Sequence, residues 1–180
     1  MEMQEIEELL KSTGALKKGC FALPNGEFAD EWYFPAKAFQ FPPTCRRLSY
    51  EIVKHFWDID PQLIIAARIG AIPFAFEIAR QLEARCIWRG NSDEVFYPSL
   101  QMHSGDRVVI IDDILTDDIE IYKPIAREIL AVDARLIGIA SLIDLTTKKT
   151  PLNVRQISVC KKNIDTPPDI SQAIPIQSRP

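Results

Sequence analysis

Short, largely apolar runs separated by helix-like segments constrain the fold of this chain more than any other feature. The runs are LIIAA (63–67), RVVIID (107–112) and RLIGIASLID (135–144). A strand that is apolar at consecutive positions is buried on both faces, which is typical of a parallel sheet covered by helices. The alternation therefore predicts an α/β fold with a mainly parallel central sheet flanked by helices.

The remaining segments fit the same architecture. Segments with apolar residues about every 3.6 positions predict helices at 2–11, 43–56, 73–83 and near 121–130. Two more short strands are expected at 86–88 and 154–160. Short apolar runs on both sides of Pro24, Asn25 and Gly26 predict a β-hairpin.

Size and charge narrow the class of protein. The 180 residues suit one domain, 1–180, with 1–42 forming an N-terminal helix and hairpin element. A net charge of −4 argues against nucleic-acid binding.

The chain has no leader-like start and no apolar stretch of about 18 residues, so we expect a cytoplasmic protein without a membrane span. The four cysteines are widely spaced and only two histidines occur, which favours reduced thiols over disulfides or zinc.

Two acids stand where such a sheet binds ligands. Asp112 ends the run 107–112 and Asp113 directly follows it, and ligands of parallel α/β sheets sit at the carboxyl ends of the strands. The alternative interpretation is that the two acids cap the next helix or solvate a loop.

The sequence RVVIIDDILT resembles the phosphoribosyltransferase signature, in which four apolar residues, two acids and two apolar residues precede Thr-Thr-Gly-Gly-Thr. Further pieces, in the same order along the chain, are similar to the orotate phosphoribosyltransferase family: 14–34, 67–82, 102–113 and 173–180. The resemblance implies a type I phosphoribosyltransferase fold with an N-terminal hairpin element and a hood-like loop at 89–106. It also implies Mg²⁺ and the joining of a pyrimidine base such as orotate to phosphoribosyl diphosphate.

The resemblance also assigns candidate site residues, although it leaves the catalytic residue unassigned. Ribose and phosphate contacts would come from Asp112, Asp113 and Thr116, and the diphosphate loop would comprise Arg68, Ile69, Gly70 and Ala71. The base would lie near Phe28, Trp32, Tyr33 and Lys37. The aromatic residues are equally explained by hairpin packing, and Arg68 and Lys37 by ordinary surface positions.

The chain departs from the family pattern wherever the ligand's charge is bound. After Thr116 it reads Asp117, Asp118, Ile119 and Glu120, where the family has glycines that wrap a phosphate. At about 5 Å and an effective dielectric of about 20, each carboxylate would repel each phosphate charge by roughly 3 kcal/mol. The loop 89–106 carries Asp93 and Glu94 and no lysine, and Leu145 stands where the family commonly has an arginine for orotate.

Three hypotheses follow. The first is an orotate phosphoribosyltransferase-like protein with weak or lost transferase activity and a nucleotide-binding or regulatory role. The second is an active transferase that uses phosphoribosyl diphosphate. The third is a divalent-cation site made by Asp112, Asp113, Asp117 and Asp118, with Glu120 nearby. The expected partners are phosphoribosyl diphosphate or a nucleotide, a second copy of the chain as a homodimer, and a protein partner.

Overall fold

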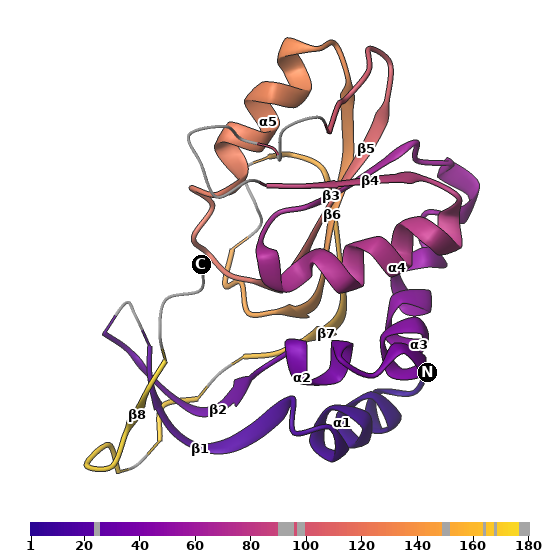
Figure 1. Ribbon diagram of the computed structural model, residues 1–180. Helices are drawn as coiled ribbons and strands as arrows, with labels where there is room; N and C mark the ends of the chain where they lie inside the picture. The colour runs from indigo at the N-terminus through magenta and orange to yellow at the C-terminus, as the bar shows by residue number, and fades with distance from the viewer. Residues whose placement is uncertain are drawn as a thin grey trace.

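The structure is a computed structural model, drawn in Figure 1, that describes residues 1–23, 26–89, 96, 100–148, 152–163, 165–167 and 169–176. The predicted hairpin tip at Pro24 and Asn25 lies outside the described residues. So does half of the hood-like loop 89–106, including Asp93 and Glu94.

The central sheet has five strands, all parallel, in the order β4-β3-β5-β6-β7. The strands are β3 (Leu63–Ala66), β4 (Arg85–Trp88), β5 (Arg107–Leu115), β6 (Arg135–Asp144) and β7 (Arg155–Lys161). All four residues of β3 are fully buried, as the continuous apolar run predicts. The predicted parallel α/β fold is therefore confirmed.

Helices cover both faces of this sheet (Figure 1). They are α3 (Pro42–Val53), α4 (Ile72–Leu82) and α5 (Tyr122–Ala131). The single turn η1 (Trp57–Ile59) lies between α3 and β3, and the single turn η2 (Ile69–Ala71) lies between β3 and α4. Prolines stand in the first turns of α3 and α4, where a missing N–H costs least. Helix α5 begins only at Tyr122, so Pro124 remains within the first turn, as expected from its ring.

Successive strand residues supply two separate cores. Ile64 and Val109 belong to the apolar cluster that contains the buried faces of α3 and α4. Their chain neighbours Leu63 and Val108 belong to the cluster that contains α5. Side chains of a strand point alternately to its two faces, so α3 and α4 cover one face and α5 the other.

The N-terminal element packs against the first of these cores. It contains α1 (Met3–Ser12), β1 (Leu16–Ala22), β2 (Phe28–Tyr33) and α2 (Ala36–Phe39), and β8 (Ile174–Pro175) joins β1 in parallel to give a small sheet ordered β2-β1-β8. The hairpin of β1 and β2 was predicted, whereas α2 and β8 were not. Trp32 and Tyr33 share the core cluster of α3 and α4, so the element and the central sheet have a continuous apolar interior. Among the described residues, no helix is long and apolar enough to cross a bilayer.

Candidate functional site

The carboxyl edge of the sheet is stepped. Ala66, the last residue of β3, is paired with Trp88 of β4 and Ile111 of β5. Strand β5 continues beyond this point beside β6, as far as the pair formed by Leu115 and Asp144. The sequence placed Asp112 and Asp113 where the strand gives way to a loop, but both lie inside β5 because β6 keeps pairing with it.

Asp112 is turned into the protein interior. Its side chain is 0% exposed, and its Oδ2 lies 3.3 Å from Nε of Arg68. The Tyr122 hydroxyl donates to the same oxygen at 2.5 Å, and the backbone N–H of Asp113 donates to Oδ1 at 2.8 Å. A buried carboxylate is tolerated only when it is paired and hydrogen-bonded, and Asp112 is both.

Tyr122 is a site residue that sequence reasoning missed. It is 1% exposed, and it reaches Asp112 because the first turn of α5 folds back over β5. No sequence motif marks it, since the contact depends on where the connection from β5 returns. The sequence leaves two interpretations of Arg68, an anion contact or a surface arginine. Its side chain is only 11% exposed and is ion-paired with Asp112.

Gly70 lies directly beside Asp113. A Cβ at Gly70 would lie 2.8 Å from Oδ2 of Asp113, so no other residue fits there without moving the carboxylate. Asp113 is 6% exposed, and its Oδ1 accepts the backbone N–H of Ile114 at 2.8 Å. In the remainder of the predicted diphosphate loop, Ile69 is exposed and Ala71 is buried. The structure thus brings Arg68 and Gly70 together with the two acids.

The acids after Thr116 have separate partners. Oδ1 of Asp118 accepts the backbone N–H of Glu120 at 3.1 Å, and Glu120 pairs with Lys123 at 2.5 Å. Asp117 instead contacts the loop after β6. The acids of the predicted cation site therefore do not converge, and the described residues contain no group of three or more His, Cys, Asp or Glu side chains placed to hold a metal ion.

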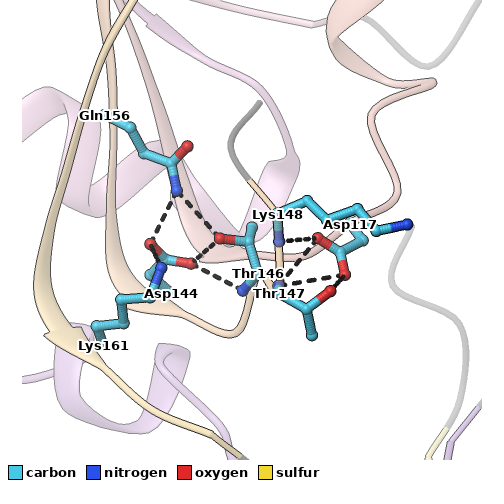
Figure 2. A network of polar contacts seen from close by, with 7 residues as sticks. All are labelled: Asp117, Asp144, Thr146, Thr147, Lys148, Gln156 and Lys161. Carbon is cyan, nitrogen blue, oxygen red and sulfur yellow. Dashed lines mark hydrogen bonds and ion pairs between the residues drawn. The ribbon is translucent and has the colours of Figure 1, made fainter. Parts of the chain in front are cut away.

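The contacts of Asp117 are shown in Figure 2. Its carboxylate accepts the Thr147 hydroxyl at 2.6 Å, the Thr147 backbone N–H at 3.1 Å and 3.2 Å, and the Lys148 backbone N–H at 3.3 Å. Burial works to raise the pKa of Asp117, but these hydrogen bonds outweigh it and hold the pKa below its usual value. The carboxylate is therefore ionised and held by donors of another loop.

A second acid anchors the same loop from within. Asp144, which is 3% exposed at the end of β6, accepts the Thr146 backbone N–H at 2.8 Å and the Thr146 hydroxyl at 2.6 Å. Gln156 donates to Asp144 at 2.8 Å and to the Thr146 hydroxyl at 3.1 Å, and Lys161 lies 3.4 Å from the carboxylate. Figure 2 shows Asp144 and Asp117 on opposite sides of residues 146–148.

The residues predicted to lie near the base make packing contacts in the N-terminal element. Trp32 and Tyr33 are buried, and Phe28 is half-buried at the start of β2. The Tyr33 hydroxyl donates to Glu31 at 2.6 Å; burial, and then this hydrogen bond, raise its pKa. The ammonium of Lys37 lies 5.5 Å from the centre of the Phe34 ring. These contacts agree with the packing alternative for the aromatic residues.

One further cation lies at the carboxyl edge. Arg89 directly follows Trp88, the last residue of β4. Its Nε is buried and has no hydrogen-bond partner within the described part of the chain. A buried guanidinium nitrogen of this kind is a donor to which a ligand could bind.

Comparisons with known proteins agree with this geometry. No family model matches the chain. The orotate phosphoribosyltransferase of Caldanaerobacter subterraneus subsp. tengcongensis is 26% identical over 168 residues, which span 92% of this chain and 88% of that protein. Orotate phosphoribosyltransferase from Aeropyrum pernix superposes with a TM-score of 0.67 at 20% identity, covering 87% of this chain and 93% of the other. UMP synthase from Leishmania donovani gives a TM-score of 0.74 at 20% identity, over 87% of this chain and 36% of that longer one.

The parallel sheet, its stepped carboxyl edge and these superpositions define a protein with the type I phosphoribosyltransferase fold. Within that fold, the chain is similar to curated orotate phosphoribosyltransferases, at 26% identity over 92% of its length.

Proposed function

We propose that this chain is an orotate phosphoribosyltransferase-like protein with weak or lost transferase activity, which binds a nucleotide in a regulatory role. The burial of Asp112 carries the proposal. In the family pattern both acids of the signature hold the ribose, whereas here the first is enclosed at 0% exposure by Arg68 and Tyr122. A ribose hydroxyl would have to displace a buried ion pair in order to reach Asp112. Breaking that pair costs more free energy than the new hydrogen bond would contribute.

The loop after β5 gives a second line of support. A phosphate cradle needs backbone N–H groups that point at the ligand and no negative charge beside it. In this chain Asp117, Asp118 and Glu120 are exposed in that loop, and α5 begins only at Tyr122. The positive end of the helix is therefore displaced from the position where the signature would place the phosphate.

The alternative is an active transferase that joins a pyrimidine base such as orotate to phosphoribosyl diphosphate. The names of the curated relatives favour it, and so does the close approach of Gly70 to Asp113. The described residues do not form a protein cage for Mg²⁺, but Asp113 suits an ion that arrives on ligand phosphates, because Mg²⁺ commonly takes only one or two protein carboxylates. In either reading, we assign the ribose side of the site to Asp113 and the diphosphate side to residues 68–71.

Calorimetric titration and turnover together separate the two functions. The proposal expects uridine 5′-monophosphate to bind, phosphoribosyl diphosphate with Mg²⁺ to bind more weakly than about micromolar, and no diphosphate release with orotate. Asp113→Asn should weaken nucleotide binding, whereas Asp118→Asn, which removes the same charge nearby, should not. Steady diphosphate release with orotate would establish the active transferase instead.

The remaining expectations are part of the same proposal. We propose one domain spanning 1–180, which the shared core of the N-terminal element and the central sheet supports. The protein would act in the cytoplasm as a homodimer that also contacts a protein partner. Its cysteines are free, and burial raises the pKa of Cys45 to about 11. Light scattering coupled to gel filtration tests the dimer directly, since a monomer at micromolar concentration would contradict it.

A further inference from the structure

The loops after β5 and β6 begin side by side at the carboxyl edge of the sheet. Leu115 and Asp144, the last residues of the two strands, are paired, and the Leu145 backbone N–H donates to the Leu115 carbonyl at 2.8 Å. Asp117 and Thr147 therefore follow only two and three residues beyond a fixed point. The contact between the loops is built on a rigid base.

The donors at residues 147–148 form an anion receptor. Two consecutive backbone N–H groups and one hydroxyl, from Thr147 and Lys148, converge on a single carboxylate within 3.3 Å. Successive N–H groups that point into one concavity are a recurrent way of binding phosphate and carboxylate oxygens. Both residues are exposed, so an anion from solvent could approach the same donors.

The receptor does not depend on Asp117 for its shape. Thr146, the residue before the donors, is 5% exposed and is held by Asp144 through its backbone N–H and its hydroxyl. Gln156 ties the same two side chains together from β7. Because this buried cluster fixes the loop from the opposite side, the donors would stay in place if the Asp117 carboxylate were removed (Figure 2).

We propose that residues 147–148 form an oxyanion site at the mouth of the ligand-binding edge, and that Asp117 occupies it as an internal competitor. A ligand phosphate or carboxylate binds there only after displacing the Asp117 side chain. The acidic residue that interrupts the signature thus acts as an autoinhibitory latch that joins the two loops. The inference rests on the proposed function only in that the ligand carries an anionic group.

The test compares two adjacent carboxylates. Asp117→Ala removes the competitor, and Asp118→Ala removes an equal charge from a residue whose carboxylate accepts the Glu120 backbone N–H in the same loop. Inorganic diphosphate without Mg²⁺ is titrated against the wild type and both variants by calorimetry. We expect the affinity to rise at least about tenfold in Asp117→Ala and less than about threefold in Asp118→Ala. Equal gains in the two variants would mean that the effect is general electrostatic repulsion and not competition at the receptor. No gain in either variant would mean that Asp117 does not compete with the anion. Either result overturns the inference.

A second substitution tests the receptor itself. Adding Thr147→Val to Asp117→Ala removes the hydroxyl donor, and we expect it to abolish most of the gained affinity. A gain that survives the double substitution would overturn the assignment of the donors. If Asp117→Ala does not fold, Asp117→Asn keeps the shape of the side chain and should show a smaller gain in the same direction, whereas no gain would count against the latch.

The choice of ligand keeps the two proposals distinct. Uridine 5′-monophosphate and uridine differ only in the phosphate, so a latch effect should appear with the nucleotide and not with the nucleoside. Binding of the nucleotide to the wild type with no change in Asp117→Ala would leave the proposed function standing and overturn the latch. A gain for diphosphate in Asp117→Ala, with no nucleotide binding to the wild type or to the variant, would support the latch and contradict nucleotide binding.

Discussion

Replacing Tyr122 by phenylalanine tests whether the Asp112 carboxylate is held as the structure describes. The change removes only the hydroxyl that donates at 2.5 Å and leaves the ring of a 1% exposed side chain in its core position. A hydrogen bond to a charged group contributes about 1.5–3 kcal/mol. The lower part of that range applies, because the ion pair with Arg68 still neutralises the carboxylate.

We therefore expect Tyr122→Phe to lower the free energy of unfolding by about 2 kcal/mol, and the melting temperature by about 4–8 °C for a chain of this length. Urea unfolding measures the free energy, and the slope of its dependence on urea should not change, because the folded state stays compact. Tyr50→Phe is the matched control, since Tyr50 is 54% exposed and should change stability by less than about 0.5 kcal/mol.

A double-mutant cycle with Asp112→Asn isolates the interaction. The neutral amide accepts a weaker hydrogen bond, so Tyr122→Phe should cost about 1 kcal/mol in that background, which gives a coupling energy of about 1 kcal/mol. If Tyr122→Phe were as mild as Tyr50→Phe, or equally costly in both backgrounds, Tyr122 would not be holding the Asp112 charge. The argument that Asp112 is committed to the protein interior would then fail.

Three further changes have defined outcomes. Gly70→Ala places a Cβ 2.8 Å from Oδ2 of Asp113, so it should weaken nucleotide binding about tenfold while the melting temperature falls little; an unchanged titration would separate Asp113 from the ligand. Gly138→Ala places a Cβ 2.9 Å from the ring of Phe56 and should cost about 1–3 kcal/mol in urea unfolding, and an unchanged midpoint would contradict this crowding. Burial works to raise the pKa of Asp106, but its hydrogen bonds from a guanidinium and a backbone N–H outweigh this and lower it. The stability that ionised Asp106 adds is present above its unfolded-state pKa of about 3.9 and is lost as the pH falls through its lower folded-state pKa. Asp106→Asn should therefore narrow the difference between the urea midpoints measured at about pH 6 and about pH 3.

The sheet could be predicted because its signal is local. Strand β3 and the first part of β5 are continuous apolar runs, and the strand β6 was placed at the residues where it occurs, 135–144. The pair β2 and β1 followed from turn chemistry in the same way. Strand β8 could not be predicted, because its two residues are exposed and become a strand only by pairing with β1, about 150 residues earlier in the chain.

The positions of the acids along the chain follow from the sequence, whereas the groups that they contact do not, for a related reason. The signature fixes where Asp112, Asp113 and Asp117 lie along the chain, but the role of a carboxylate depends on the donors that it meets, and those come from distant segments. Arg68 lies 44 residues before Asp112, and Thr147 lies 30 residues after Asp117. A Coulomb estimate that treats each acid after Thr116 as an isolated charge therefore overstates the repulsion, because Glu120 is paired with Lys123 and Asp117 already accepts hydrogen bonds from Thr147 and Lys148. Two acids of this signature therefore make internal contacts. Asp112 is ion-paired with Arg68, and Asp117 occupies the anion receptor at residues 147–148.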